Sequence, residues 1–541
     1  MISVSNDWIN AHKKRLLPEG ELRITIYASE TFNSLNLLKV LDRQDIIDFS
    51  YKTSLSIIGK ETQETEAVLK IFKASLLDYD FPKTSFAKVE IGYHINGSIE
   101  WHFYDCLQIA EQEIPINGNE ATFTLKQLGY RSFENEYILG SGSNGLGVSP
   151  LTITNRIIDY EKRTYFPSMC VVSMPTFLYS CERSLGTCSV KNALLYISQA
   201  LGTTFYARTF LYTSSGIEKV GLNFNFAVVD KNAIVDDYVI DNNNSYTYPE
   251  IEIDYYDFLK ISVYESRTKK DSQGNIEKIG FNSTLSFSPS TPYHIIQYGN
   301  NIFNQTSISG GLLYDFEIYG NCIYVSSLNT ATYSITGEIS LLEVEKTIST
   351  TNLVYGGGKY ILEVDNPLIG KMMRLYGNTE GYLKEWSVEG EVISCDFRID
   401  PRLQLLDKVQ IIDFAGNVKF AVVEELEWTY KGAFNGKIKA RRFEPLPIPP
   451  EVNIDEYGDK FSFDVYNDNY KDVDLVIVYS GGTITKSIPA NSKITINDTN
   501  THQLNDSFRA EEQGLLEDDV YCYFLISGKH TQNASILERQ V

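Results

Sequence analysis

The sequence has few cysteines, and their spacing suits neither a disulfide framework nor a metal site. There are seven, none of them in a Cys-x-x-Cys pair: Cys106, Cys170, Cys181, Cys188, Cys322, Cys395 and Cys522. An odd number without paired spacing argues against both kinds of cross-link. We therefore expect buried free thiols in a protein made in a reducing cytoplasm.

Long apolar runs are also missing. No stretch approaches the roughly 18 apolar residues that a membrane-spanning helix needs, so no membrane span is predicted. The basic run His12 to Arg15 is followed by no apolar segment, so we do not expect a signal peptide. Basic residues are outnumbered, with Lys+Arg 48 against Asp+Glu 70 and a formal net charge of −22. A polyanion attracts neither nucleic acid nor an anionic membrane.

Motifs that carry catalytic or nucleotide chemistry are absent or incomplete. The six histidines form no His-Glu-x-x-His pattern. His94 and His102 flank a predicted hairpin and are placed to face each other, which we interpret as a cross-strand contact. The glycines 142, 145 and 147 resemble a phosphate loop, but Val148-Ser149-Pro150 follows and is expected to block a helix there. We predict no nucleotide site.

Acidic residues form two clusters that deserve comparison with known sites. Glu424, Glu425 and Glu427 lie on one predicted strand, with Glu425 and Glu427 on one face and Glu424 on the other. Glycosidases use two convergent carboxylates, but we expect these three to be solvated edge residues. The acidic segment Asp236, Asp237, Asp241 and Asn242 to Asn244 lacks the spacing of a calcium loop. The sequence thus predicts no catalytic, cofactor-binding or metal-binding residue.

What the sequence does contain is a strand-type composition. The chain contains 36 tyrosines and 28 phenylalanines but only 5 methionines. Aromatic side chains suit a pleated, half-buried surface. Apolar and polar residues alternate in many short segments, and Asn96-Gly97 between two of them predicts a hairpin with a type I′ turn. Strands are expected at 22–26, 45–51, 55–58, 67–72, 89–94, 98–104, 120–125, 203–211, 251–263, 359–364, 461–466, 473–479, 483–488, 493–496 and 520–526.

Two helices are predicted. The first runs from an N-cap at Ser5 to the basic residues at Arg15. The second covers Ser189 to Leu201, where an apolar stripe recurs at helical spacing and Gly202 is a C-cap candidate. The fold class is therefore mainly β, with several β-barrel-like or β-sandwich-like domains and a few short helices.

The loop and proline signals divide the chain into five segments. Residues 1–140 form a β-rich domain, 151–250 an α+β domain around the helix 189–201, and 251–443 one or more β-barrel-like domains. Four prolines within six residues make 444–450 a stiff linker. Residues 451–541 then read as a small β-sandwich.

Three phrases in the second half of the chain occur in an unusual order. They are Val364 to Ile369, Arg398 to Val409 and Trp428 to Gly436. Together with the opening Ser3 to Tyr27, the Asp45 to Ser50 strand, the helix at 189–201 and the Ile253 to Val263 segment, they resemble the hub or tail-associated proteins at the tip of bacteriophage tails. The resemblance covers about residues 1–443 as an order of motifs. Gly370 to Tyr376 is shorter than the amphipathic helix of those proteins, and residues 451–541 are too short for the hydrolase that many of them carry.

This resemblance implies a tail-hub-like architecture and a structural role in the virion, assembled in the host cytoplasm. The chain would form a homo-oligomeric ring, with three copies expected, that caps or gates the tail channel for DNA ejection. DNA would pass the lumen without being specifically bound, and 451–541 would contact a host glycan or another tail protein. Pro367 and Pro401 would punctuate strands, Asp407 would shape a turn, and Gly432 and Gly436 would allow a tight loop.

Two other classes remain open from the sequence. One is a multidomain β adhesin or carbohydrate-binding protein, for which a signal peptide is expected. The other is a tail-associated peptidoglycan or glycan hydrolase, in which Glu425 and Glu427 are the residues to test.

Overall fold

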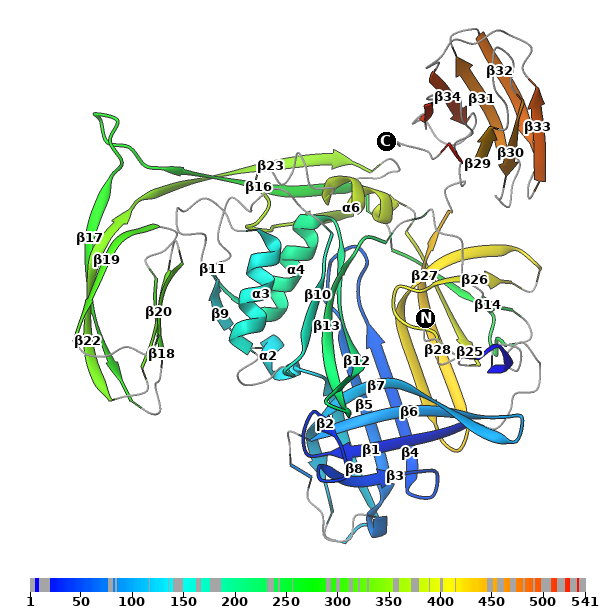
Figure 1. Ribbon diagram of the computed structural model, residues 1–541, viewed down its shortest axis with the longest axis horizontal. Coiled ribbons are helices and arrows are strands. Elements are labelled where there is room, and N and C mark those ends of the chain that lie inside the picture. Colours follow the sequence, from blue (N-terminus) through cyan, green and yellow to red (C-terminus); the bar gives the residue numbers. More distant parts are fainter. Residues whose placement is uncertain are drawn as a thin grey trace. The chain divides into compact units, whose positions relative to one another are not determined.

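The computed structural model of the chain consists mainly of β-strands in several sheets, with a few short helices (Figure 1). This confirms the predicted fold class. The chain divides into two compact units, one of Met1–Val229 with Val235–Phe443 and one of Asp230–Ile234 with Glu444–Val541. The structure describes residues 5–8, 20–75, 81–82, 85–115, 117–134, 136–139, 149–161, 167–175, 186–229, 231, 238–241, 244–254, 256–288, 293–297, 302–310, 315–319, 322–327, 330–353, 360–370, 379–388, 390–398, 402–413, 415–444, 451–454, 462–467, 473–479, 482–489, 492–497, 507–512, 521–525 and 533–534.

The first half of the largest sheet comes from the N-terminal part of the chain. Its strands are Gly20–Tyr27 (β1), Leu37–Leu41 (β3), Ile46–Ser54 (β4), Glu64–Phe72 (β5), Phe86–Ile95 (β6), Ser98–Glu113 (β7) and Glu120–Gln127 (β8), followed in β4–β5–β8–β7–β6–β1–β3 order. Ala67, Leu69 and Ile71 alternate into the core along β5. Asn96 and Gly97 both have positive φ, so the predicted type I′ hairpin is confirmed.

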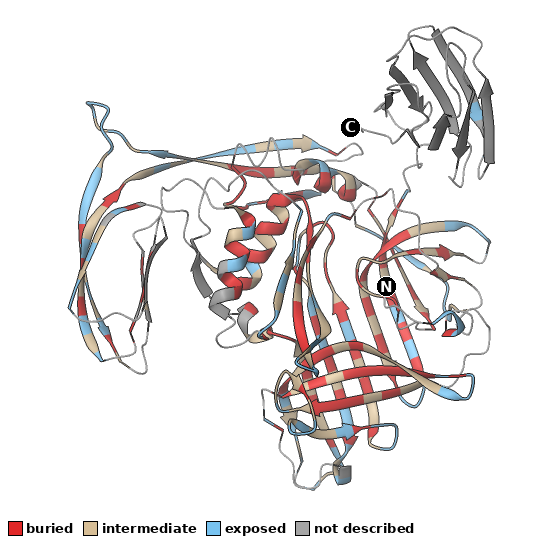
Figure 2. Cartoon of the chain, viewed as in Figure 1, coloured by how far each residue is buried: buried red, intermediate tan, exposed pale blue. Residues whose placement is uncertain are grey.

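The second half of this sheet comes from residues far along the chain. It holds Val239–Ile240 (β14), Glu250–Ile253 (β15), Glu391–Phe397 (β25), Lys408–Ile412 (β26), Val418–Tyr430 (β27) and Phe434–Phe443 (β28). The two halves join where β27 pairs antiparallel with β4, as in the Trp428–Tyr51 pair. The predicted segments 1–140 and 251–443 therefore share one 13-stranded sheet among the described residues. Most of the buried side chains on the strands of this sheet belong to one hydrophobic core, and Figure 2 shows buried residues in red.

Helices and a smaller sheet adjoin this core. The helices are Lys73–Ser75 (η1, 3-10), Tyr130–Glu134 (α2), Pro150–Glu161 (α3), Val190–Leu201 (α4) and Thr379–Val388 (α6). Cys170–Ser173 (β10), Ile217–Ala227 (β13), Thr204–Ser214 (β12) and Thr31–Phe32 (β2) form a four-stranded sheet, and Glu136–Leu139 (β9) pairs with Gly186–Ser189 (β11).

The predicted helix at 189–201 is confirmed as Val190–Leu201 (α4), with the predicted C-cap at Gly202, while Ser189 is its N-cap and not its first helical residue. The Ser189 side chain accepts a hydrogen bond from the Asn192 N–H, and Gly202 adopts the left-handed conformation at φ 65°. Its apolar stripe is buried, with Ala193, Leu194 and Ile197 fully covered.

The expectation that Pro150 blocks a helix is wrong. Pro150 begins α3, and the Ser149 hydroxyl accepts the Thr152 N–H at 3.1 Å. Proline is favoured at the first helical position because its missing N–H would have no partner there and its φ is already helical. The glycines 142, 145 and 147 lie outside the described residues, and the strand before them, β9, pairs antiparallel with β11 rather than in a parallel βαβ unit.

Residues 258–352 form an arm whose outer part, from Phe281 to Ile339, has its own core, whereas Leu259, Ile261 and Val263 belong to the core of the large sheet. Phe258–Thr268 (β16) pairs with Leu342–Asn352 (β23), and Ile361–Val364 (β24) runs parallel to β16. Two three-stranded sheets follow β16 in the chain: Lys278–Phe287 (β17), Ala331–Ser340 (β22) and Ile302–Ser309 (β19), and Tyr293–Gln297 (β18), Cys322–Ser326 (β21) and Asp315–Tyr319 (β20). Their core, which includes Phe281, Phe303 and Tyr333, is separate from that of the large sheet.

The second unit has two four-stranded antiparallel sheets. One holds Glu451–Ile454 (β29), Ser462–Asn467 (β30), Ser492–Asn497 (β33) and Asn533–Ala534 (β36), and the other Val473–Tyr479 (β31), Gly482–Ile488 (β32), Ser507–Glu512 (β34) and Tyr521–Leu525 (β35). The five strands predicted here are present. The proline linker at 445–450 lies outside the described residues, as does most of the first predicted helix.

Two strand predictions are wrong. Ile251 to Val263 is not one strand, because β15 joins the large sheet and β16 joins the arm. Leu55 to Ile58 is a buried turn between β4 and β5, not a strand. The Leu55 amide still bonds to the Glu424 backbone carbonyl of the paired strand β27, but the Ile57 amide bonds to the Glu424 side chain, so the backbone ladder ends there.

Candidate functional site

The most concentrated buried polar chemistry lies where the 55–60 turn meets a bulge in β27. The register of β27 against β28 shifts between Val423 and Glu425, which leaves Glu424 as an extra residue in the ladder. The Glu424 carboxylate therefore turns inward, where Oε1 accepts the Ile57 N–H and the Arg441 Nε–H, each at 3.0 Å. The Glu424 carbonyl accepts the Leu55 N–H at 2.9 Å.

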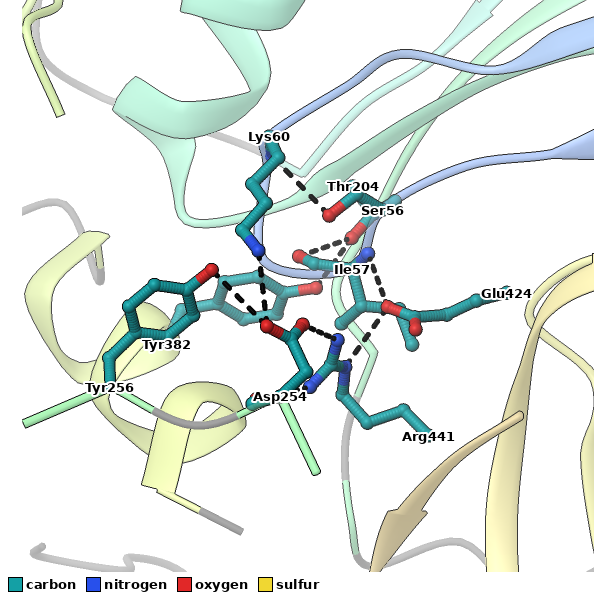
Figure 3. A network of polar contacts seen from close by, with 9 residues as sticks. All are labelled: Ser56, Ile57, Lys60, Thr204, Asp254, Tyr256, Tyr382, Glu424 and Arg441. Carbon is teal, nitrogen blue, oxygen red and sulfur yellow. Dashed lines mark hydrogen bonds and ion pairs between the residues drawn. The ribbon is translucent and has the colours of Figure 1, made fainter. Parts of the chain in front are cut away.

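Arg441 on β28 links this carboxylate to a second one (Figure 3). Its Nη2 donates to Asp254 Oδ2 at 2.9 Å, and Lys60 Nζ reaches Asp254 Oδ1 at 3.2 Å. The Arg441 side chain is only 3% exposed. Two carboxylates thus meet two cations, of which Glu424 and Arg441 are buried, Asp254 is half-buried and Lys60 is exposed.

These contacts shift the titration of the groups involved. Partial burial of Asp254 opposes its ionisation, but the Arg441 hydrogen bond and charge, with Lys60, hold the pKa of Asp254 below its ordinary value. Burial likewise works against the charged form of Arg441, yet Glu424 and Asp254 raise the pKa of Arg441. Asp254 and Arg441 therefore remain charged across the physiological pH range.

Hydroxyl groups complete the network. Thr204 Oγ1 and the Tyr382 hydroxyl lie 2.5 Å apart, and Thr204 Oγ1 also donates to the Ile57 carbonyl at 3.3 Å. Burial raises the pKa of Tyr382 well above its ordinary value, so it remains a neutral phenol. Tyr256 donates to Asp254 Oδ1 at 3.3 Å, and the Lys60 ammonium lies 4.7 Å from the Tyr256 ring centre.

The arrangement suits stable connection better than catalysis. Each of the four charged groups has an opposite charge within 3.2 Å, so none stands ready as a general base. The network instead ties together the 55–60 turn, β12, the end of β15, α6, β27 and β28.

A further carboxylate, the half-buried Asp105 on β7, has no cation at hydrogen-bond distance among the described contacts. It accepts from the Thr209 hydroxyl at 2.5 Å, the Cys106 N–H at 2.8 Å and the Tyr51 hydroxyl at 2.8 Å. Burial raises the pKa of Asp105, and these donors only partly offset the effect.

The three glutamates of β27 are placed differently from the prediction. Glu424 is not a solvated edge residue: it is buried, and β27 is an interior strand between β28 and β4. Glu425 and Glu427 do share a face, where Lys52 approaches them at 3.2 and 4.0 Å. No sequence signal distinguishes Glu424 from its neighbours, because the bulge that turns it inward depends on strand pairing.

The two hairpin histidines do not face each other. His94 pairs with Ile99 and His102 pairs with Ile91, which places them on opposite faces of the ladder. His102 instead contacts Glu100 at 2.7 Å, and His94 lies 3.5 Å from Glu21. The prediction of a cross-strand contact between them is wrong.

The acidic segment before β15 is described only in part. Asp236, Asp237, Asn242 and Asn243 lie outside the described residues. The side chain of Asn244 accepts the Asp241 N–H and donates to the Val239 carbonyl, which closes a turn. In the part of the chain that the structure describes, no group of three His, Cys, Asp or Glu side chains could hold a metal ion.

The phrases behind the family resemblance occupy structural positions. Asn366 is buried in a turn after β24, where its Nδ2 donates to the Tyr196 carbonyl of α4 and its Oδ1 accepts the Leu368 N–H. Asp407 Oδ2 accepts the Gln404 N–H at 2.8 Å, so it shapes a turn as predicted. Asp400 and Pro401 lie outside the described residues.

The third phrase forms the hairpin between β27 and β28. Gly432 lies in its turn with φ 78°, as predicted. Gly436 does not belong to the loop: it is in β28, opposite Trp428 and Phe397.

The thiols agree in part with expectation. Cys106 and Cys395 are buried and free, whereas Cys170 and Cys188 are half-buried. Burial raises the pKa of the Cys395 thiol to about 12, which favours the protonated thiol over the reactive thiolate. Among the described helices, none is long and apolar enough to cross a membrane.

Comparison with known proteins finds likeness in structure only. No family model and no curated protein matches the chain. A tail protein from Neisseria meningitidis MC58 is similar over 78% of this chain and 97% of its own, at 10% identity and a TM-score of 0.41. A 43 kDa tail protein of prophage MuSo2 from Shewanella oneidensis is similar over 78% and 98%, at 9% identity and a TM-score of 0.38. A chain of the phage P2 baseplate is similar over 77% and 98%, at 13% identity and a TM-score of 0.29. Likeness at this level describes structure and transfers no role to this chain.

Proposed function

We propose that this chain is a structural protein of a bacteriophage tail, at the tail tip or baseplate hub or in a tail knob. It assembles with copies of itself, three being expected, into a ring that caps or gates the channel for DNA ejection. Other tail proteins are its neighbours, and residues 451–541 contact one of them or a host glycan.

The observation that carries the proposal is the structural use of the resemblance phrases. Asn366 fastens the turn after β24 to α4, Asp407 caps a turn, and Gly432 closes the β27–β28 hairpin. The acids that a catalytic interpretation would use are engaged: Glu424 is neutralised by Arg441, and Glu425 lies beside Lys52.

The charge of the chain supports the same role. A net charge of −22 gives DNA no attraction to the protein as a whole, since contact releases no counterions from the phosphate backbone. A channel lining that does not bind its cargo lets DNA pass.

Purified particles provide the test. Mass spectrometry of phage particles, purified from a host that expresses the chain with the rest of its tail genes, should recover the chain in fixed proportion to other tail proteins. Absence from intact particles, with abundant chain in the lysate, would contradict a structural role.

A further inference from the structure

The largest sheet ends in an open strand. Among the described residues β15 pairs only with β25, and all four of its residues are exposed. An edge strand presents unpaired N–H and C=O groups, which form a template for another strand. The Asp254 N–H, just after β15, donates to the carbonyl of Gly390, just before β25, so it points toward β25. Because antiparallel residues bond alternately, the amides and carbonyls of Ile251 and Ile253 point to the open side.

At Ile251 the apolar face of the sheet continues onto this edge without cover, whereas Ile253 lies opposite Glu391. Ile251 lies opposite Ile393 of β25, which lies opposite Ala440 of β28, and both of these are fully buried. Ile251 is nevertheless 49% exposed and Ile253 is 68% exposed. One more strand carrying apolar side chains on this face would extend the core by the same alternation.

The opposite face of β15 is acidic. Glu250 and Glu252 alternate with the two isoleucines and are exposed. A strand added here meets two carboxylates on one face and two apolar side chains on the other. Opposite charges across a strand pair stabilise it and like charges oppose it. Pairing of β15 with β15 of a second copy would set glutamates against glutamates, so the edge favours a different segment.

We propose that β15 is a docking edge for an extended segment of a partner protein in which basic and apolar side chains alternate. The segment adds a strand to the large sheet, with its basic side chains beside Glu250 and Glu252 and its apolar ones over Ile251 and Ile253. This inference goes beyond the tail role and stands on β15 alone.

Fluorescence anisotropy with the full chain tests it. The probes are two short labelled peptides, one alternating lysine with valine and one alternating glutamate with valine. The wild-type chain should bind the lysine peptide with about a tenfold preference, the ratio that two cross-strand charge pairs support. The double variant Glu250→Lys/Glu252→Lys should reverse the preference.

A chain with a net charge of −22 attracts a basic peptide at any part of its surface, so a matched control is needed. Glu343→Lys/Glu345→Lys makes the same change of charge on two exposed residues of β23, and should keep the wild-type preference. Ile251→Pro removes an N–H on the open side while leaving the bonds to β25, and should abolish binding of both peptides.

Three outcomes would overturn the proposal. The first is equal binding of both peptides by the wild type, and the second is reversal by the β23 control as well as by the β15 variant. The third is binding that Ile251→Pro leaves intact. None of these bears on whether the chain occurs in particles, so this inference and the tail role fail separately.

Discussion

Replacing Arg441 by methionine should destabilise the first unit more than any surface substitution, because it leaves the buried Glu424 carboxylate without a positively charged partner. Arg441 makes the 3.0 Å contact to Glu424 and the 2.9 Å contact to Asp254. Asp254 keeps Lys60 and its side chain is 32% exposed, so water can compensate there. The Glu424 side chain is 10% exposed, and among the described residues it would keep only the Ile57 N–H as a side-chain partner.

The expected cost is about 3–5 kcal/mol, the range for removing one partner of a buried ion pair. The double variant Arg441→Met/Glu424→Gln removes the stranded charge while keeping an acceptor for Ile57. It should therefore be more stable than Arg441→Met alone, with a coupling of about 1–3 kcal/mol.

Urea unfolding of the full chain followed by tryptophan fluorescence measures these differences. Trp8, Trp101, Trp386 and Trp428 are the four tryptophans of the chain, and all belong to the first unit. The signal therefore reports that unit, and the midpoint shift at constant slope gives the change in free energy.

An exposed ion pair supplies the control. Arg267 pairs with Glu265 at 2.8 Å while its own side chain is 70% exposed, so Arg267→Met should leave the midpoint unchanged. An Arg441→Met midpoint equal to that of wild type would refute the reasoning, as would a double variant less stable than the single one.

Further predictions concern two carboxylates with opposite pKa shifts and one helix cap. Because the folded pKa of Asp105 is raised, its contribution to stability falls as pH rises from its ordinary value through the raised one. Asp105→Asn should thus gain melting temperature, relative to wild type, more at neutral pH than in acid. The folded pKa of Asp254 is lowered, so its contribution is present above the ordinary value and lost as pH falls through the folded one. Asp254→Asn should accordingly lower the melting temperature most at neutral pH. Calorimetry of both variants at neutral and acid pH measures these differences, and the opposite pH trend for either variant would contradict its prediction. Ser189→Ala removes the acceptor for the Asn192 N–H and should lower the free energy of unfolding, measured with urea, by about 1 kcal/mol. An unchanged free energy would show that this cap does not stabilise the fold.

Patterns within a few residues predicted structure well. The apolar stripe and Gly202 predict the α4 helix, because both signals are local. The Asn96-Gly97 turn chemistry predicts the hairpin there. The sequence does not predict the α3 helix, because proline breaks helix interiors, although the first helical position tolerates it.

Contacts between distant segments were out of reach. Ile57 and Glu424 are 367 residues apart in the chain, and Arg441 and Asp254 are 187 apart. The turn at Leu55 to Ile58 looks like a strand because it is apolar, and only the inward carboxylate of Glu424 explains its shape. The opposite faces of His94 and His102, by contrast, follow from the two-residue turn at Asn96-Gly97, because the ladder is regular from Ile95–Ser98 to Ile91–His102.

Electron microscopy of the purified full-length chain at high concentration tests the ring assembly most directly. The account predicts a closed ring of identical copies around a central hole, with three copies expected. A monodisperse monomer under the same conditions would contradict it.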